Sequence, residues 1–378
     1  MKNSTTLNDI TIISKDLFSE MDFTENGSKE YKQFNFLYNP KFYCLGLEGK
    51  DIVLNRINIQ GSFKGIGGKV ENCQLNEIKV ESAYSCTEFY FCNKIDVFKS
   101  EFKGGSFACA AFPSSSIIKV ENCKLINPKS TGINPSGGSG LNSIPKHLRF
   151  INNYIIAGDA INLENGADDA LISNNIIYCA PLINKSINNS AIGVQVHDAL
   201  ANNTIKNITI ENNSIYSYKN ILFGIGINVG NTLGNIIEDV LIFNNKISGA
   251  NEGVRIENTN SYFASNILVK QNQITCYSFG IRLFNVSNSN FNNNFFKAYY
   301  SSWNDNLWGV QIHNCAFINI DSNLTQGFAK HYFQTGKSKA VLIKSPIIEK
   351  GNYTKKFTKL FFESNIIADS DKAVLYER

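Results

Sequence analysis

The stretch GVRIEN at residues 253–258 recurs along the chain with the same alternation of side-chain types. Each copy has a small residue, an aliphatic, a polar and a second aliphatic residue, then a variable residue and Asn or Asp. The copies start about 30 residues apart, a spacing typical of solenoids that repeat one structural unit. The other copies are AINLEN at 160–165, GVQVHD at 193–198, GINVGN at 226–231, GIRLFN at 280–285 and GVQIHN at 309–314.

The alternation predicts β-strands, because successive side chains of a strand point to opposite faces. The two aliphatic positions of each copy therefore share one face, and we expect them to stack inward on those of the next coil. A second recurrent feature is an Asn that ends a strand and precedes an apolar residue by two positions. It predicts a ladder of turn asparagines, since Asn tolerates left-handed backbone and hydrogen-bonds along a stack. The expected ladder is Asn93, Asn153, Asn175, Asn213, Asn245, Asn272, Asn294 and Asn365, with Cys73 and Cys123 in the same position.

These patterns predict an all-β fold, a single-stranded right-handed parallel β-helix with N- and C-terminal caps. Residues 1–50 are less regular and are predicted to form the N-terminal cap. The β-helix itself is expected over 51–340, and the last coil and C-terminal cap over 341–378. A left-handed β-helix of hexapeptide repeats is the competing architecture, but long coils with irregular loops favour the right-handed form.

Composition limits the classes of function. The chain of 378 residues is 43% hydrophobic and 18% charged, as globular proteins are, and its formal charge of +4 gives no support for nucleic-acid binding. No apolar run reaches membrane-spanning length, so no membrane insertion is predicted. The start shows no secretory signal, which predicts a protein that is cytoplasmic as synthesised, with phage association or leaderless export left open. The nine cysteines form no CxxC pair and are predicted to be reduced core residues, with no metal and no cofactor.

Alignment of the copies predicts which outward side chains are neighbours, because adjacent coils lie about 4.8 Å apart. Amide and guanidinium groups of one outward row suit sugar hydroxyls and carboxylates, and the two arginines are expected to clamp an anionic group. The small residues that open each copy are predicted to form a shallow trough beside this row, and Trp308 to stack on sugars at one end. The predicted substrate-binding row is Asn162, Gln195, Asn228, Arg255, Arg282 and Gln311.

A second outward row carries the predicted acid–base residues. The alignment places Glu164 beside His197, and a carboxylate next to a His can orient it as a general acid or base. Asp159, on the coil of Glu164, and Glu257, two coils beyond His197 and roughly 10 Å away, complete the predicted catalytic set. That separation suits a hydrolase that places a water opposite the sugar.

Residues 50–370 resemble the pectin-lyase-like superfamily of right-handed β-helices, and three segments are similar to motifs of its polygalacturonase family. GDAIN at 158–162 resembles the Gly-Asp-Asp-x-Ile strand, with one Asp missing. GIGINVG at 224–230 resembles the Gly-His-Gly segment, with Ile225 in place of His. Residues 255–257 resemble the substrate-binding Arg-Ile-Lys, with Glu257 in place of Lys. The resemblance implies an acid role for Asp159, a substrate-binding role for Arg255 and an acidic polysaccharide as ligand.

Three functions follow from these observations. The first is a depolymerase, with hydrolysis favoured, of an anionic bacterial polysaccharide such as a capsular or teichoic-acid-like polymer. The second is a uronic-acid polysaccharide lyase or C5-epimerase, and the third is a non-catalytic carbohydrate-binding solenoid such as a part of a phage tail spike. The predicted partner is the anionic polysaccharide, and the oligomeric state, monomer or trimer, is left open.

Overall fold

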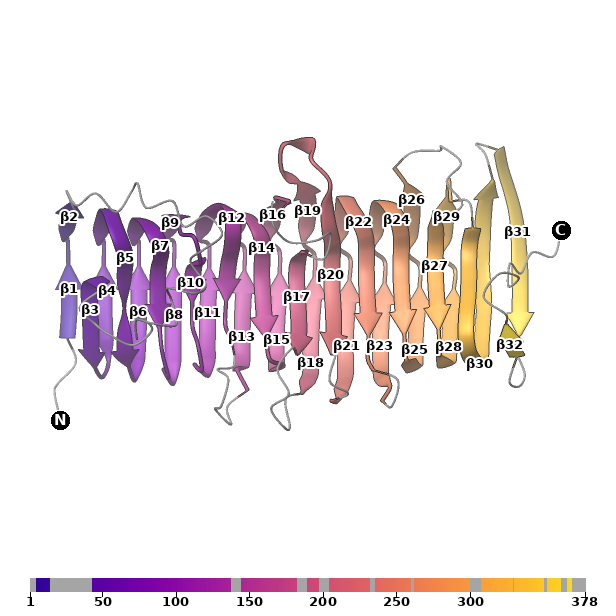
Figure 1. The fold of residues 1–378 in the computed structure, drawn as a ribbon, viewed down its shortest axis with the longest axis horizontal. Helices are drawn as coiled ribbons and strands as arrows, with labels where there is room; N and C mark the ends of the chain where they lie inside the picture. The colour runs from indigo at the N-terminus through magenta and orange to yellow at the C-terminus, as the bar shows by residue number, and fades with distance from the viewer. Residues whose placement is uncertain are drawn as a thin grey trace, which may run out of the picture.

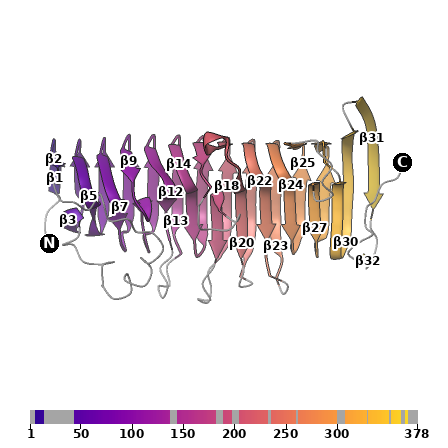
Figure 2. The ribbon, with the colours of Figure 1, turned by 45° about the horizontal axis from the view of Figure 1, so that its top comes forward.

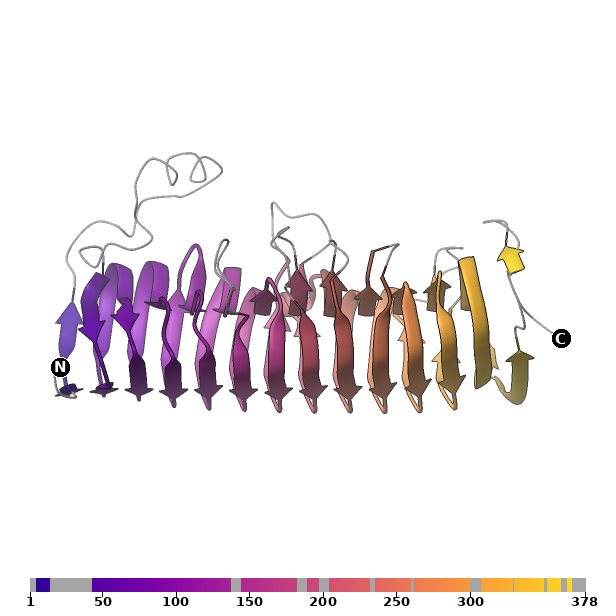
Figure 3. The same ribbon diagram turned by 90° about the horizontal axis from the view of Figure 1, so that it is seen from below.

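The computed structural model is a right-handed parallel β-helix, as the sequence predicts (Figure 1). Coils follow one another along a single axis from the N- to the C-terminal end (Figures 2 and 3). The structure describes residues 5–13, 43–136, 144–181, 189–196, 204–231, 235–259, 262–299, 307–328, 330–349, 352–361 and 366–368. Each coil contributes strands to three walls, here named A, B and C.

Wall C and wall A meet at a corner that several long strands turn without interruption. The register of β22 against β24 shifts at residues 248–252, where the chain rounds this corner. The first half of each such strand belongs to wall C and the second half to wall A. These strands are β5 (Asn58–Val70), β7 (Lys79–Phe89), β12 (Lys124–Asn134), β14 (Tyr154–Glu164), β22 (Lys246–Glu257) and β24 (Gln273–Phe284).

Shorter strands complete these two walls in the remaining coils. Wall A includes β3 (Tyr43–Gly49), β10 (Ala108–Ala111), β17 (Ser190–Val196), β20 (Phe223–Asn231), β27 (Trp308–His313) and the start of β30 (Lys330–Glu349). Wall C includes β2 (Thr11–Ile13), β9 (Glu101–Gly104), β16 (Ile176–Cys179), β19 (Ser214–Ser217), β26 (Phe295–Ala298) and β29 (Leu324–Gln326).

Wall B pairs separate strands in parallel, each with its counterpart in the next coil. Its strands are β1 (Thr5–Asn8), β4 (Ile52–Asn55), β6 (Asn72–Asn76), β8 (Lys94–Phe98), β11 (Ile117–Glu121), β13 (Lys146–Ile151), β15 (Ala167–Ser173), β18 (Ile205–Glu211), β21 (Ile237–Phe243), β23 (Ala264–Lys270), β25 (Val286–Asn292) and β28 (Ala316–Asp321).

The core is built as predicted from the aliphatic positions of the repeat. Two stacks from wall A run along the helix axis, and every member is at most 1% exposed. Their burial removes apolar surface from water in each coil, which is the main force that stabilises the solenoid. The stacks are Ile161, Ile192, Ile227, Val254, Ile281 and Val310, and Leu163, Val194, Val229, Ile256, Leu283 and Ile312. Val194 therefore lies in the second stack and not, as predicted, in the first, and Val196 pairs with Asn231.

The predicted asparagine ladder is present at the corner between walls B and C. Each backbone N–H donates to the side-chain oxygen of the next Asn, as from Asn153 to Asn175 at 2.9 Å. The ladder continues through Asn213, Asn245, Asn272 and Asn294 to Asn323, which the sequence analysis omitted.

Two expected ladder members are placed elsewhere. Cys123 does precede Asn153 in the ladder, and its N–H donates to the Asn153 oxygen. Asn93 is exposed, however, and Cys73 is a wall B strand residue paired with Ile52 and Ile95, so these two predictions are wrong. An Asn near a strand end does not by itself identify which of three corners it occupies. Asn365 lies outside the described residues.

The predicted trough of small residues is also wrong. A Cβ added to Gly253 would lie 2.3 Å from Cγ2 of Ile274, a buried wall C side chain, so this position faces inward. The strand turns its corner here, and two successive residues, Gly253 and Val254, therefore point to the interior. Small residues are needed because wall C side chains fill the corner, and Ala160 and Gly226 occupy the same row.

Parallel stacking begins before residue 50, because β1, β2 and β3 pair with the strands that follow them. At the other end, β30 pairs antiparallel with β31 (Asn352–Phe361) and β32 (Ile366–Ala368), which ends the parallel stacking. The cap boundaries remain predictions. None of the helices within the described ranges has the length and apolar character to span a membrane.

Candidate functional site on wall A

Wall A is bordered by the longer connections of the chain. The corner between walls B and C is tight, with two residues between Glu211 and Ser214 and two between Phe243 and Lys246. In contrast, the connections that lead into wall A are longer before Ser190 and before Trp308, and the connection that leaves wall A is longer after Val196. Binding residues concentrate where loops border a rigid scaffold, so wall A is the face on which to seek a site.

One wall A insertion is described in full. Residues 218–222 separate β19 from β20 and project beyond the neighbouring coils (Figure 1). Lys219 and Asn220 both have left-handed backbone, with φ of 53° and 57°. Two consecutive non-glycine residues in this region are unusual and strained, which is typical of segments shaped by function.

Three outward rows cross wall A. The corner row contains Asp159, Ser190, Ile225, Glu252, Phe279 and Trp308. The central row contains Asn134, Asn162, Gly193, Asn228, Arg255, Arg282 and Gln311. The outer row contains Glu164, Gln195, Gly230, Glu257, Phe284 and His313.

The predicted register is wrong for one coil. Gln195 pairs with Glu164 and Gly230 in the outer row, and Gly193 takes the expected place beside Asn162 and Asn228. The strand is displaced by two residues, which keeps the aliphatic side chains inward because the strand period is two. The other five members of the predicted substrate-binding row do lie in the central row.

The central row holds buried polar atoms without a partner. The side-chain oxygens of Asn134, Asn228 and Gln311 are shielded from water and accept no hydrogen bond from any described residue. Nε of Arg282 likewise has no acceptor within the described part of the chain. Native proteins pair almost all such groups, so these unpaired atoms mark the central row as the candidate site.

Glu252 holds the two arginines of this row. Its Oε1 accepts from Nη2 of Arg255 at 2.6 Å and from Nη1 of Arg282 at 2.7 Å, and its Oε2 accepts from Nε of Arg255 at 2.8 Å. The Glu252 side chain is 5% exposed. The predicted anion clamp of two arginines is therefore not empty, because a carboxylate of the protein already bridges the pair.

Aromatic side chains, Trp308 among them, cover the C-terminal end of wall A, and the stacking of Trp308 on sugars stays a prediction. The Trp308 ring lies 5.2 Å from Phe279 in an edge-to-face arrangement and 4.2 Å from Phe333, which the sequence analysis missed. Cζ of Arg282 lies 4.7 Å from the ring centre of Phe279 and 4.8 Å from that of Phe284. Rings of this kind can stack on the apolar face of a sugar. Trp303 lies outside the described residues.

The predicted catalytic residues do not form one cluster among the described residues. Asp159 is buried, and its Oδ1 accepts the N–H of Ser190 at 3.0 Å. Glu164 accepts the side-chain amide of Asn162 at 2.8 Å. Glu257 lies three coils from Glu164, about 14 Å away, which exceeds the roughly 5–10 Å of a glycosidase carboxylate pair. The predicted pairing of Glu164 with His197 is wrong in register, because Gln195 lies beside Glu164. His197 itself lies outside the described residues.

The N-terminal coils of wall A are closed to water. Lys64 and Glu88 form a fully buried ion pair at 2.9 Å, and the Tyr90 hydroxyl donates to Glu88. Nζ of Lys64 lies 5.0 Å from the ring centre of Tyr43. Burial raises the pKa of Glu88 against the opposing effect of Lys64. The candidate site therefore occupies the middle and C-terminal coils.

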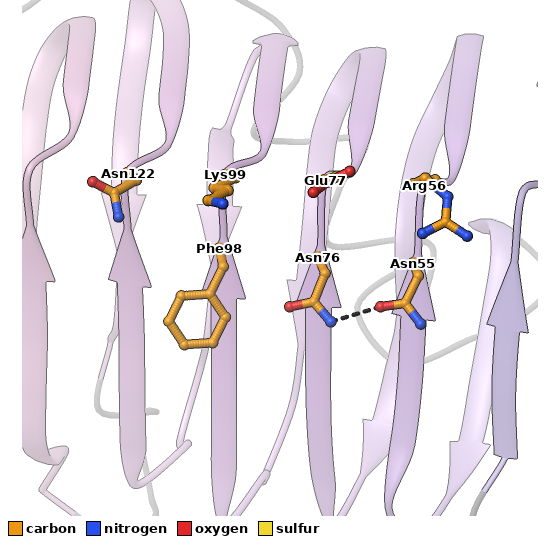
Figure 4. Close-up of a pocket in the computed structure, with 7 residues that line it drawn as sticks. All are labelled: Asn55, Arg56, Asn76, Glu77, Phe98, Lys99 and Asn122. Carbon is orange, nitrogen blue, oxygen red and sulfur yellow. Dashed lines mark hydrogen bonds between the residues drawn. The ribbon is translucent and has the colours of Figure 1, made fainter.

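A separate polar depression of about 330 Å³ lies at the turn between walls B and C (Figure 4). Its polar groups bind one another across coils: Asn76 donates to Asn55 at 2.7 Å, and Arg56 pairs with Asp9. We assign this depression a structural role. No group of three or more His, Cys, Asp or Glu side chains suited to a metal ion occurs in the part of the chain that the structure describes.

Glu252 was not among the predicted catalytic or substrate-binding residues. The usable signal was its position three residues before Arg255, because the corner places both residues outward. The alternation rule alone assigns Glu252 and Arg255 to opposite faces. Phe333 was missed because its coil has no copy of the repeated motif.

No protein-family model and no curated protein matches the chain. Solved structures of a tailspike protein of E. coli bacteriophage HK620 do match it. A double mutant in complex with a pentasaccharide gives a TM-score of 0.40 at 10% sequence identity, and a mutant in complex with a hexasaccharide gives 0.37 at 11%. Each match covers 81% of this chain and 58% of the tailspike chain. The chain thus spans little more than half the length of these proteins, and what it is similar to in them is the parallel β-helix.

Proposed function

We propose that wall A binds a polysaccharide that lies along the helix axis over the central row. The observation that carries the proposal is the line of unpaired amide oxygens on Asn134, Asn228 and Gln311. These atoms accept hydrogen bonds only, so their partner must donate, and the hydroxyls of a sugar chain supply a donor at each residue. Trp308 and Phe333 add a surface for sugar rings at the C-terminal end.

The proposed activity is depolymerisation of an anionic bacterial polysaccharide, such as a capsular or teichoic-acid-like polymer, by hydrolysis. Glu164 is the best-placed catalytic carboxylate, because it lies outward, partly exposed and beside the central row. Its partner must come from outside the described residues, and His197, one residue beyond β17, is the candidate. Asp159 and Glu257 are secondary candidates for the same role.

A non-catalytic binding function is the second candidate. It is favoured by the separation of Glu164 from Glu257 and by the buried, hydrogen-bonded state of Asp159. On this reading wall A recognises a polymer and leaves its length unchanged.

One experiment separates the two. Purified protein is incubated with a panel of bacterial capsular and wall polymers, and retention is followed by gel shift and chain length by size analysis. Retention of one polymer, weakened at least tenfold by Asn228→Ala, is expected from binding on wall A. Shortening that Glu164→Gln abolishes, with products that gain one water, indicates hydrolysis, whereas absorbance near 232 nm indicates a lyase. Retention without shortening indicates the binding module, and retention of no polymer contradicts both.

A further inference from the structure

The two arginines of the central row differ in which edge of the guanidinium is occupied. Arg255 donates to Glu252 through Nε and Nη2, the paired edge that binds carboxylates side-on. Arg282 donates to the same carboxylate through Nη1 alone. The Nε–Nη2 edge is therefore filled on Arg255, whereas on Arg282 the Nε of that edge is buried and has no acceptor among the described residues.

Arg282 is also held in place. The rings of Phe279 and Phe284 flank its guanidinium from the two neighbouring rows, and Glu252 fixes its Nη1. Its side chain is 24% exposed. A guanidinium whose orientation is fixed before binding loses little freedom when it takes a ligand, which favours recognition.

The charge of the arginine pair and Glu252 also favours an anionic ligand group. Two guanidiniums and one carboxylate sum to one net positive charge (+2 − 1 = +1) in a partly buried setting. Glu257 of the outer row is left out of this sum because it is partly exposed, and a ligand group with one negative charge would neutralise the three charges that are counted. Trp308 lies one coil beyond Arg282 in the corner row and provides an adjacent ring surface for the sugar that bears this group.

We infer that Arg282 is the subsite for a singly charged oxyanion of the polymer, the carboxylate of a uronic acid or a phosphodiester, and that Glu252 is a positioning residue for it. The inference rests on the proposed function, since it names the charged group of the bound polysaccharide. The sequence resemblance assigns this role to Arg255, but Glu252 already fills the paired edge of that arginine.

Small probes test the subsite without a polymer. The chain has two tryptophans, so a Trp303→Phe background leaves Trp308 as the only indole reporter. Titration with sodium glucuronate or dimethyl phosphate is expected to change Trp308 emission and to saturate. Glucose should need at least a tenfold higher concentration. The probe that saturates identifies the oxyanion as carboxylate or phosphodiester.

Variants locate the contact. Arg282→Gln is expected to remove the preference for the charged probe over glucose, and Arg282→Lys to restore part of it. Arg255→Gln should weaken the preference less. Glu252→Ala removes the carboxylate from the paired edge of Arg255 and should increase the affinity for the dianion of inorganic phosphate by at least tenfold. A single cooperative thermal transition shows that each variant is folded.

The outcomes are separable from those for the polymer. Equal response to charged and neutral probes, or an unchanged preference in Arg282→Gln, overturns the subsite even where a polymer is retained on wall A. A charged-probe preference lost in Arg282→Gln supports the subsite even where no polymer in the panel is retained, and then the proposed function alone fails.

Discussion

Asn245 shows how many hydrogen bonds one ladder residue makes. Its side-chain oxygen accepts the N–H and the side-chain amide of Asn213, and its amide donates to Ile210 O and to the Asn272 oxygen, all within 3.0 Å. Asn245→Ala leaves buried donors and acceptors unpaired and is expected to cost about 3 kcal/mol. Chemical denaturation checks this, with Asn244→Gly as the control. Asn244 precedes Asn245 in an exposed left-handed turn, φ 50°, and its replacement by Gly should be nearly neutral.

Phe317 is strained in its wall B bulge. Its φ is 56° and its side chain is 57% exposed, while Asn266 and Asn288 occupy the same bulge in preceding coils. Bulky side chains pay about 1 kcal/mol or more for left-handed backbone, so Phe317→Asn is expected to stabilise the protein by about 1 kcal/mol. The thermal midpoint measures the effect. A lower midpoint would show that the contact of Lys339 with this ring outweighs the strain.

His331 makes stability depend on pH. It is buried at the corner between walls C and A, its Nδ1 lies 2.6 Å from the Thr325 hydroxyl, and burial lowers its pKa to about 4. Between that value and the unfolded value of 6.5 the unfolded chain binds more protons. Stability should therefore fall as pH drops from about 6.5 to 4, by up to roughly 3 kcal/mol. His331→Gln should flatten the difference in unfolding free energy between pH 7 and pH 4.5, and an unchanged slope would contradict the assignment.

At the scale of elements, Gly253 and Gly230 look alike in sequence but differ in their surroundings, because Gly253 lies at the corner between walls C and A. A Cβ on Gly253 would meet Ile274 and the Gly280 carbonyl at 2.3 and 2.6 Å, whereas one on Gly230 would meet nothing closer than 3.5 Å. Gly253→Ala is expected to cost about 1–3 kcal/mol through overpacking, and Gly230→Ala to be close to neutral. Denaturant midpoints of the two variants give the comparison. Equal effects would contradict the inward direction of the row that contains Gly253.

The same corner marks where sequence reasoning succeeds and where it fails. Alternation of residue types identifies inward and outward positions within a strand, and both aliphatic stacks were predicted correctly except in the coil of β17. Alternation cannot detect a shift of two residues, so it did not predict the displacement of β17 that moves Gln195 to the outer row. The alternation rule also assumes straight strands, so it assigned the Gly253 row outward and did not predict that Glu252 lies beside Arg255. Register and corners depend on contacts between coils, which a single repeat does not contain.

For the whole molecule, the fold class followed from the repeat, because one coil cannot bury its aliphatic face alone. The distribution of stability follows from the same stacking. In such solenoids each coil contacts only its neighbours, so a local defect should stay local. We expect Gly253→Ala to speed amide hydrogen exchange in β20, β22 and β24 and to leave β6 and β8 unchanged. Exchange measured by mass spectrometry would contradict this if protection fell equally in all coils.

The tight corner between walls B and C has a consequence for how such a protein can change. Its asparagines keep successive coils in step, and the segments of variable length are all found where the chain enters or leaves wall A. Evolution or protein design can therefore change the connections that border wall A without disturbing the stacking of the coils. The corner between walls B and C keeps a constant length and holds the coils in register. Residues at the connections of wall A can therefore be changed in one coil at a time.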